Sequence, residues 1–391
     1  MFKEFLIAGY LSLTKTIFVV CKLFPVKNKS VMVSSFGDNT DYVAREILRQ
    51  NKSEVVILTS RKSNYSFEHL GLSNRNIITF DRLNMINYIR SMYHLATARV
   101  VFVDNYFAFL SVMDFKPNVE CVQLWHAAGA VKKFGMEDPT FDSRSTAAQK
   151  RFVNVYKRFN KVVVGSDEMI PIFKAAFNLK DEQFLKTGIP RTDFFFDVDA
   201  MDAAKRAVLS EFPTIKDKKV ILYAPTFRRD QLNGQAIQLD IDKITATLGS
   251  EYLLLIRMHP AVKIGIGNSY TAGVIDVSGY PDVHHLLVVT DYLISDYSSL
   301  PYEFALLNRP QIFYPYDLVE YEKESGFWHA YEDVVPGPVV HSTDELIELI
   351  CKDDFDMKRV RDFSDRWNRY STGQSAQELV RDLKIWKDEG I

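Results

Sequence analysis

Residues 99–104 read Arg-Val-Val-Phe-Val-Asp, an apolar run of four residues that ends in an aspartate. Similar runs recur along the first half of the chain, at 31–36, 55–59, 76–80, 121–125 and 161–165. Near-continuous apolar runs rich in β-branched residues are typical of parallel strands that are covered on both faces. Amphipathic stretches between them, such as 41–49 and 169–177, predict helices. This alternation predicts a doubly wound α/β domain.

A second series of apolar runs follows beyond residue 200, at 219–224, 252–257, 274–277, 292–295, 311–314 and 339–340. The polar stretch Asp197–Lys205 separates the two series and predicts the junction between two domains. Two α/β domains of similar size favour a ligand-binding cleft between them. We therefore expect an N-terminal helix at 1–25, one domain at 26–195, and a second domain at 196–391 that includes C-terminal helices.

The overall composition excludes several classes of protein. The 391 residues carry 48 Lys plus Arg and 50 Asp plus Glu, a net charge of −2, which argues against a dedicated nucleic-acid binder. A hydrophobic content of 47% argues against disorder. Cys21, Cys121 and Cys351 lie far apart with no CxxC pair, so a disulfide scaffold or a cysteine zinc site is disfavoured.

The N-terminus is the most apolar part of the chain, yet it is basic. The stretch 5–20 is interrupted by Lys15 and by hydroxyl residues, so it lacks an unbroken apolar span of about 20 residues. Residues 1–30 hold five lysines against one glutamate, a local charge of +4. Such a helix can lie in the headgroup layer of an anionic membrane. The alternative is a first helix that packs on its own domain.

Polar groups follow the ends of several predicted strands. His126 comes directly after the strand at 121–125 and is followed by small residues, which let a substrate approach the backbone. A histidine in this position can act as a general base near neutral pH. The alternative is a structural histidine whose hydrogen bonds are satisfied.

Arginines recur at the same kind of position. Arg191 follows a Gly-Ile-Pro turn, Thr226 and Arg228 follow the strand at 219–224, and Arg257 ends the next one just before His259. One such arginine can be an ordinary surface ion pair. Their repetition at successive strand ends favours a site for anionic groups, because Arg binds phosphate oxygens in a bidentate manner.

The most informative strand end is Ser295-Asp-Tyr-Ser-Ser299, which leads into a predicted helix. Ser298 and Ser299 are expected near the helix N-cap, where hydroxyl and backbone N–H groups bind phosphate. A plain N-cap explains the serines but not Asp296. Glu303, further along the helix, is placed to accept hydrogen bonds from a ribose or polyol hydroxyl.

Other catalytic motifs are missing from the sequence. It contains no GxGxxG after the first strand and no Walker motif, which disfavours nicotinamide and P-loop chemistry. The hydrolase elbow GxSxG is not met at Ser298. The carboxylate pairs Asp197/Asp199 and Asp240/Asp242 are better explained as solvated loop residues than as metal ligands, so we expect no metal site.

Taken as a set, these segments resemble the CDP-glycerol glycerophosphotransferases of bacterial wall teichoic acid synthesis. The matching segments are 124–126 with 132–135, 188–193, 221–228, 257–260, 276–278, 295–299, 309–310 with 316–318, and 336–338. Their order and spacing cover most of residues 120–345, whereas residues 1–100 match only in general pattern.

The resemblance implies a GT-B architecture, with two Rossmann-like domains facing a central cleft. Acceptor handling then belongs to the first domain and CDP-glycerol binding to the second, with no obligatory cofactor. It further implies peripheral attachment to the cytoplasmic face of the cell membrane. The implied partners are a lipid-linked disaccharide acceptor, an anionic membrane surface and other teichoic acid synthesis enzymes, and no nucleic acid.

Within the family the chain resembles the glycerol-phosphate primases. Polymerising members usually read Trp-His-Gly-Thr-Pro-Leu-Lys-Lys, whereas this chain has Trp125-His-Ala-Ala-Gly-Ala-Val-Lys-Lys133 and no large extra N-terminal domain. A primase transfers one glycerol phosphate from CDP-glycerol to the undecaprenyl-pyrophosphate-linked ManNAc-GlcNAc disaccharide and releases CMP. The departure at Ala127 leaves acceptor specificity open.

The expected site has three parts. His126 is the general base, and His259 is a second catalytic histidine that helps to neutralise the pyrophosphate and the departing CMP. Lys132 and Lys133 are expected to bind the acceptor. The donor-binding residues are expected to be Arg191, Thr226, Arg228, Arg257, Asp296, Ser298, Ser299 and Glu303. The alternatives are a CDP-glycerol or CDP-ribitol transferase that adds further units, a GT-B enzyme acting on a UDP-sugar, and a catalytically inactive scaffold.

Overall fold

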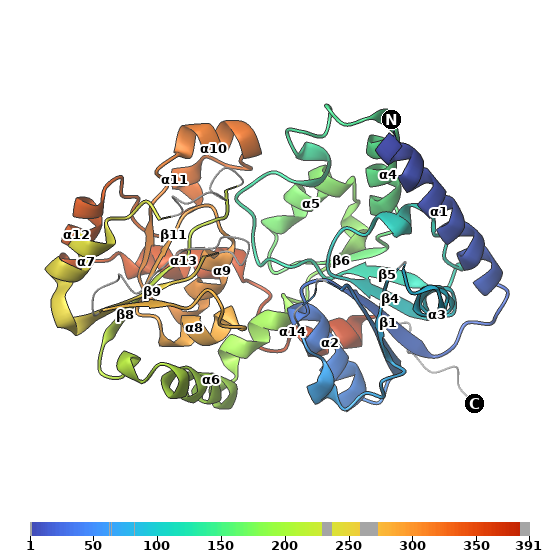
Figure 1. Cartoon of the computed structure of the whole chain (residues 1–391), viewed down its shortest axis with the longest axis horizontal. Helices are drawn as coiled ribbons and strands as arrows, with labels where there is room; N and C mark the ends of the chain where they lie inside the picture. The colour runs from blue at the N-terminus through green and yellow to red at the C-terminus, as the bar shows by residue number, and fades with distance from the viewer. Residues whose placement is uncertain are drawn as a thin grey trace. The chain divides into compact units, whose positions relative to one another are not determined.

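The computed structural model describes residues 2–61, 63, 65–81, 83–228, 237–258 and 273–383. The chain divides into two compact units, and each holds one parallel sheet (Figure 1). Unit 1 consists of Met1–Ala127, Phe134–Asp193 and the segment from Tyr370 onward. Unit 2 consists of Ala128–Lys133 and Phe194–Arg369.

The sheet of unit 1 has seven strands in the order β3-β2-β1-β4-β5-β6-β7. They are β1 (Lys29–Ser34), β2 (Glu54–Thr59), β3 (Ile77–Thr79), β4 (Val100–Val103), β5 (Glu120–Gln123), β6 (Lys161–Val163) and β7 (Phe184–Leu185). Every neighbouring pair is parallel. The six strands predicted from the apolar runs are confirmed. The seventh strand, β7, has only two residues and leaves no such run in the sequence.

Helices cover both faces of this sheet, as a parallel sheet requires. They are α1 (Phe2–Cys21), α2 (Asp38–Arg49), α3 (Met85–Ala96), α4 (Thr146–Tyr156), α5 (Met169–Phe177) and α14 (Ser375–Asp382). The C-terminal helices were expected with the second domain, but α14 packs against α2 of unit 1 (Figure 1). The Asp193 carboxylate explains this position, because it accepts hydrogen bonds from the first backbone N–H groups of α14, those of Ser375 (2.8 Å) and Ala376 (2.9 Å).

The sheet of unit 2 has five parallel strands in the order β10-β9-β8-β11-β12. They are β8 (Lys219–Tyr223), β9 (Tyr252–Ile256), β10 (Val274–Asp276), β11 (Tyr292–Ser295) and β12 (Gln311–Phe313). A further strand predicted at 339–340 is reduced to a single bridge between Val339 and Phe313. Both sheets share the order of a doubly wound fold, in which ligands bind where the winding reverses.

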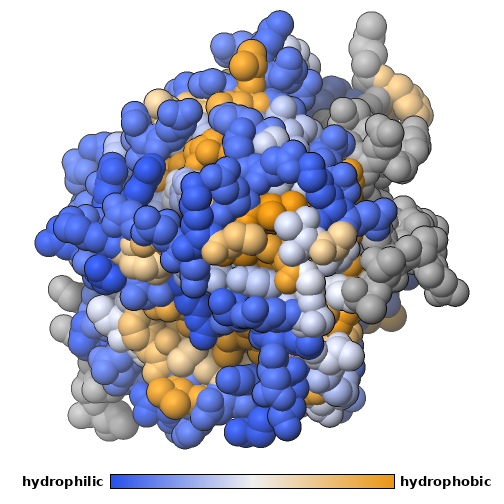
Figure 2. Space-filling view, turned by 90° about the vertical axis from the view of Figure 1, so that its left-hand side faces the viewer, coloured by the Kyte–Doolittle hydropathy of each residue, from blue (hydrophilic) through white to orange (hydrophobic). Residues whose placement is uncertain are grey.

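The helices of unit 2 are α6 (Val198–Glu211), α7 (Ile241–Leu248), α8 (Val283–Val289), α9 (Leu300–Phe304), α10 (Leu318–Ser325), α11 (Tyr331–Val334), α12 (Thr343–Lys352) and α13 (Met357–Trp367). The predicted junction Asp197–Lys205 is the start of α6. Asp197 and Asp240 are N-caps, whose carboxylates accept from Ala200 N and Lys243 N at 3.0 Å. Hydrophilic residues cover most of the face that carries α7 and α12 (Figure 2).

Helix α1 packs on unit 1 by one face only. Leu11, Thr14, Phe18 and Cys21 are buried at helical spacing, and α1 contacts α3. Within the described residues α1 is the one helix that has the length and apolar composition to cross a bilayer, and most of it is not buried in the protein. The two alternatives considered for the N-terminus therefore do not exclude each other.

Candidate active site

His126 lies directly beyond the carboxyl end of β5, on a backbone held in an unusual conformation. The preceding residue, Trp125, has φ 60°, which side-chain-bearing residues seldom adopt. The Trp125 N–H donates to Gln123 Oε1 (2.9 Å), and its carbonyl accepts from Asn39 Nδ2 (3.0 Å). Its indole packs against Phe134 of the same unit. Backbone strain of this kind persists only where the surroundings enforce it, and it is concentrated at functional sites.

The imidazole of His126 is held in one tautomer. Its Nδ1–H donates to the backbone carbonyl of Asp104 (3.0 Å), which leaves Nε2 without a proton. Phe36 stacks on the ring, with centroids 4.3 Å apart. Burial, reinforced by the positive charge of Arg191, lowers the pKa of His126 to about 4, although the bond to Asp104 acts in the opposite direction. The ring is therefore neutral at physiological pH and presents a basic nitrogen.

Asp104 fixes the loop between β1 and α2 beside this histidine. Its buried carboxylate accepts from Ser34 Oγ (2.8 Å) and from the backbone N–H groups of Ser35 and Phe36 (both 2.9 Å) and Gly37 (3.4 Å). Burial raises the pKa of this carboxyl, and these donors oppose the rise. Asp104 thus positions both the stacking partner of His126, Phe36, and the acceptor of its Nδ1 proton.

Arg191 lies in the same unit as His126, as predicted. Its backbone N–H donates to Asn39 Oδ1 (2.9 Å), and its guanidinium pairs with Asp38 (3.3 Å). Asn39 is buried and also binds the carbonyl of Trp125, so one side chain joins the His126 segment to the Gly188–Arg191 turn. Gly188 has φ 83°, and a Cβ there would meet the Tyr370 carbonyl at 2.4 Å, so glycine is required.

Two of the donor-binding residues predicted in unit 2, Thr226 and Arg228, meet a third, Asp296, where β8 and β11 lie side by side. One oxygen of this buried carboxylate accepts from the backbone N–H of Thr226 (2.8 Å). The other pairs with Arg228 Nη1 (2.6 Å). The hydroxyl of Thr226 is buried and has no hydrogen-bond partner among the described residues.

Arg228 is more enclosed than the sequence indicates. It is 6% exposed and forms two parallel bonds of 2.8 Å with Asp317, in addition to its pair with Asp296. Its guanidinium also lies over the rings of Tyr316 (4.7 Å) and Tyr321 (5.0 Å). These contacts raise its pKa further, so it is permanently charged. Asp317, which begins α10, was not identified from the sequence.

Lys132 lies near this cluster, because residues 128–133 belong to unit 2 although His126 belongs to unit 1. The Lys133 N–H donates to Gly326 O (2.9 Å), and Trp328 N–H donates to Val131 O (3.1 Å). A Cβ on Gly129 would meet the Tyr302 ring at 2.1 Å, so this segment is closely packed. Burial lowers the pKa of Lys132, while the charge of Asp296 counteracts this.

The remaining predicted residues are placed differently. Arg257 Nη1 donates to the carbonyls of Val277 (3.2 Å) and Tyr280 (2.7 Å), and burial lowers its pKa. Ser298 Oγ accepts from Leu300 N–H (3.2 Å), whereas Ser299 makes no capping bond with its side chain.

Glu303 and His259 are the last two of the predicted site residues. Glu303 is fully buried, and its carboxylate pairs with His284 Nε2 (2.9 Å). His259 lies outside the described residues.

Three residues of these clusters were missed from the sequence: Asp104, Asn39 and Asp317. Asp104 carried the same signal as Asp296, since both are the first polar residue after a buried strand. Asp317 lies within the family-like segment 316–318, but no role was assigned to it. Asn39 carried no signal, because it acts from a helix start far away in the sequence. No group of three or more His, Cys, Asp or Glu residues that could hold a metal ion occurs in the described part of the chain.

Comparison with known proteins identifies the family. The model of the CDP-glycerol:poly(glycerophosphate) glycerophosphotransferase family matches residues 16–385. The chain is 36% identical over 358 residues to the teichoic acid glycerol-phosphate primase of Bacillus subtilis (strain 168), covering 90% of this chain and 91% of that protein. It is 32% identical to the teichoic acid ribitol-phosphate primase of Bacillus spizizenii, covering 92% and 91%.

A solved structure supports the fold. The wall teichoic acid polymerase TagF superposes with a TM-score of 0.77 at 23% identity, covering 97% of this chain and 96% of that one. The match of the family model over nearly the whole chain decides membership. The chain belongs to the CDP-glycerol:poly(glycerophosphate) glycerophosphotransferase family and is a transferase.

Proposed function

We propose that this enzyme is a teichoic acid glycerol-phosphate primase, which transfers one glycerol phosphate from CDP-glycerol to a lipid-linked ManNAc-GlcNAc disaccharide. The observation that carries the chemistry is the bond from His126 Nδ1 to the Asp104 carbonyl. It leaves Nε2 free to accept a proton, which is what a general base needs. The substrate assignment rests on the primases that resemble this chain over nine-tenths of their length.

The reaction follows from these groups. His126 Nε2 takes the proton of an acceptor sugar hydroxyl while that oxygen attacks the β-phosphorus of CDP-glycerol. The new bond joins the sugar oxygen to phosphorus, the phosphoanhydride bond breaks, and CMP leaves with its electron pair. A positioned base contributes about 10²- to 10⁴-fold.

The donor binds in unit 2 in this proposal. Thr226 offers a hydroxyl that has no hydrogen-bond partner among the described residues, and Arg228 and Lys132 offer positive charge beside Asp296. Two cations face two carboxylates, Asp296 and Asp317, so the cluster is close to neutral before the donor binds. Fixed dipoles and charges that need no rearrangement stabilise the transition state of phosphoryl transfer. Arg191, Arg257, Ser298, Ser299 and His259 remain candidate donor ligands, with Lys133 for the acceptor.

The two units are proposed to form the two halves of a GT-B transferase. Each has the doubly wound strand order, and in such sheets the ligand binds at the carboxyl ends of strands where the winding reverses. His126, Arg191, Thr226, Arg228 and Asp296 all follow the carboxyl ends of strands.

Formation of CMP from CDP-glycerol and a short-chain lipid disaccharide tests the proposal. Stabilisation against heating by CDP-glycerol, and not by UDP-N-acetylglucosamine, is the expected companion result. Release of CMP without an acceptor, or stabilisation only by the UDP-sugar, would contradict it.

The mass of the product separates a primase from a polymerase. Relatives named as polymerases match this chain at 30–34% identity, which makes this test necessary. With excess CDP-glycerol, a primase gives a single added glycerol phosphate. A ladder of additions would reject the primase assignment and leave the family unchanged.

We also propose that α1 and α3 attach the enzyme to the cytoplasmic face of the membrane. Most exposed large hydrophobic side chains of the described chain lie on these helices or within two residues of their ends, or in the turn that follows α1, among them Phe5, Leu23, Leu83 and Ile86. Exposed lysines, including Lys15, accompany them, which suits an anionic surface. Exposed apolar patches of this kind mark membrane or protein contacts.

A matched pair of variants tests the attachment. Ile86 on α3 is 74% exposed and Val319 on α10 is 75% exposed. Ile86→Asp is expected to reduce sedimentation with phosphatidylglycerol vesicles, because burying a charge in the headgroup boundary is unfavourable. Val319→Asp is the control and should leave sedimentation unchanged. Equal behaviour of the two variants would refute the proposed surface.

A further inference from the structure

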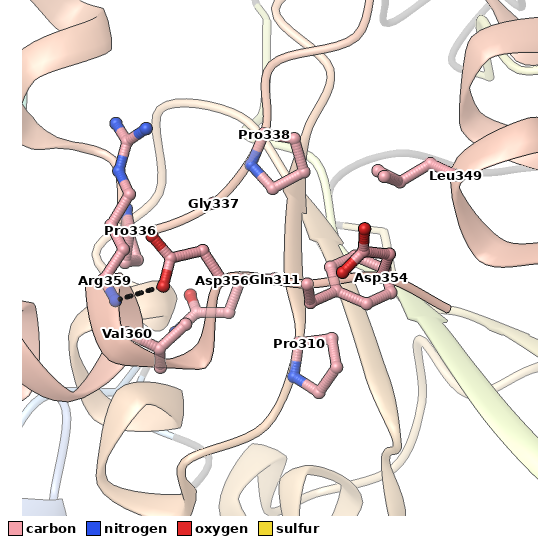
Figure 3. Close-up of a pocket in the computed structure, with 11 residues that line it drawn as sticks. Pro310, Gln311, Pro336, Gly337, Pro338, Leu349, Asp354, Asp356, Arg359 and Val360 are labelled. Atoms are coloured by element: carbon pink, nitrogen blue, oxygen red, sulfur yellow. Dashed lines mark hydrogen bonds between the residues drawn. The ribbon is translucent and has the colours of Figure 1, made fainter. Parts of the chain in front are cut away.

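A cavity of about 250 Å³ lies in unit 2 (Figure 3), and none of the residues that line it is a candidate active-site residue. It is lined by Pro310 and Gln311 at the start of β12, by the 336–338 segment, and by residues between α12 and α13. The candidate active-site residues follow the carboxyl ends of parallel strands. Gln311 begins its strand, so the cavity is at the opposite edge of the same sheet.

The floor of the cavity contains a polar side chain without a partner. Gln311 is 1% exposed, and neither its Oε1 nor its Nε2 has a hydrogen-bond partner within the described residues. A buried amide without partners is unfavourable, and native proteins seldom contain one.

The geometry of β12 directs this amide to the α13 side of the sheet. The next residue, Ile312, packs in the core cluster with α7 and α12. Successive side chains of a strand point to opposite faces, so Gln311 faces the other side, where α13 supplies Arg359 and Val360 to the cavity. The amide thus lies on the side of the sheet where the cavity is lined by α13.

The rest of the lining limits what the occupant can be. The prolines at 310, 336 and 338 carry no N–H and present apolar surface, as does Phe355. Gly337 lies so close to the strand that a Cβ would be 1.8 Å from the Gln311 carbonyl, so no side chain fills the space there.

The rim carries charge of both signs. It holds the exposed residues Asp354, Asp356 and Arg359, and Figure 3 shows Asp356 bonded to the backbone of Arg359 (3.2 Å). Arg359 also donates to Glu332 O (2.8 Å). Two carboxylates beside one guanidinium disfavour a phosphate or another anion. The occupant is therefore expected to be neutral.

We propose that this cavity binds the ring of a neutral sugar. A pyranose has an apolar C–H face that suits proline and phenylalanine surfaces. It also has an edge of hydroxyl groups that can pair with both the donor and the acceptor of the Gln311 amide and with the Asp354 carboxylate. Sites for drug-sized ligands run from about 300 to 1,000 Å³, so this smaller cavity suits a single ring. The proposal does not depend on the reaction assigned to the enzyme.

Ligand-observed NMR on the full-length protein tests this site, with N-acetylglucosamine, glucose and glycerol as probes and CMP as a charged comparison. Saturation transfer to one of the sugars is the expected result. Transfer to CMP, the proposed product at the active site, should be the same in the wild type and in Gln311→Leu. Gln311→Leu keeps the volume and removes both polar atoms, and it should weaken sugar binding about tenfold, the value of one or two hydrogen bonds.

Matched variants distinguish loss of the sugar site from loss of folding. Asp354→Asn removes a rim carboxylate and should weaken binding, whereas Asp344→Asn at the far end of α12 should not. Leu349→Trp at the cavity wall should block entry if Gln311→Leu does not fold. Absence of sugar binding, or binding that is unaffected by both Gln311→Leu and Leu349→Trp, would overturn the proposal. Release of CMP from CDP-glycerol is measured on the same proteins. Absence of CMP release would contradict the proposed reaction, whereas absence of sugar binding would contradict this site.

Discussion

In both units an aspartate that follows a strand accepts hydrogen bonds from the backbone of a neighbouring loop, but the two aspartates differ in their other partners. In each sheet an aspartate follows the strand that lies beside the first strand of that sheet in chain order, Asp104 after β4 beside β1 and Asp296 after β11 beside β8. Each carboxylate accepts hydrogen bonds from backbone N–H groups of the loop after that first strand, from Ser35, Phe36 and Gly37 or from Thr226. Asp104 accepts hydrogen bonds from backbone N–H groups and from a hydroxyl, whereas Asp296 accepts from a backbone N–H group and from a guanidinium.

This difference separates the roles of the two units. In unit 1 the aspartate aligns a loop and a carbonyl around a neutral imidazole, so the site is suited to moving a proton. In unit 2 the aspartate, together with Asp317, holds a permanent cation in place, so in the proposed reaction this cluster supplies fixed charges to the donor. The same doubly wound strand order therefore places an aspartate beside a loop in each unit. The groups that bind each aspartate determine which chemistry the neighbouring side chains can perform.

Replacement of the base is expected to have the largest effect on activity. His126→Gln keeps a side chain of similar length but removes the basic Nε2. It should lower kcat by about 10²- to 10⁴-fold, the usual contribution of a general base. Stabilisation by CDP-glycerol should persist, since the donor site belongs to unit 2. Turnover near that of the wild type would remove His126 from the mechanism.

The largest effect on stability is expected at Asp296. Asp296→Asn leaves Arg228 buried without one of its two counter-charges, and breaking a buried pair costs about 3–5 kcal/mol. Asp344→Asn, which breaks the exposed pair with Lys243, is the control and should leave the free energy of unfolding nearly unchanged. Urea denaturation of both variants measures the difference. Equal values would show that Asp296 is not a charge partner in solution.

Asp104→Asn tests the other aspartate. The new amide NH₂ faces backbone N–H donors, so the Phe36 loop should shift and kcat should fall about tenfold, as expected for a loss near 1.4 kcal/mol. The KM for CDP-glycerol should be unchanged. Ser34→Ala removes only one donor to Asp104 and should have a smaller effect. A larger loss of stability than in Asp296→Asn would contradict the comparison of the two sites.

The pH dependence of kcat/KM tests the role of His126, and we expect it to be the smallest of these effects. Its pKa is lowered from 6.5 to about 4, so kcat/KM should stay level as the pH falls through 6.5 and decline only near pH 4, where the imidazole takes up its proton. Arg191 contributes to that lowering, because its positive charge disfavours the imidazolium. Arg191→Gln should therefore move the acidic decline to higher pH. A decline near 6.5 in the wild type would show that the histidine is not buried during catalysis.

The strands and several site residues were predictable because their signal is local. Apolar runs such as Val100–Val103 specify buried parallel strands, and the residue after each run must lie at the carboxyl edge of a sheet. His126, Arg228 and Asp296 were proposed as candidate site residues by this rule. Asp104 obeys it equally and was overlooked, although its sequence position is equivalent to that of Asp296.

Other features depended on contacts between distant segments. Asn39 is significant only because it bonds to Trp125 and Arg191, and Asp317 only because it faces Arg228. The position of α14 on unit 1 follows from Asp193, which is about 180 residues earlier in the chain than the helix N–H groups it binds.

The sequence by itself determined that the chain has two doubly wound α/β regions, which residues end their strands, and which family it belongs to. These properties follow from hydrophobic periodicity and short motifs, which act over a few residues. Only the tertiary structure decided the tautomer of His126, the enclosure of Arg228 and the pairing of Glu303 with His284. Burial and hydrogen bonding set the charge and direction of a side chain, and both depend on groups that folding brings together from far apart.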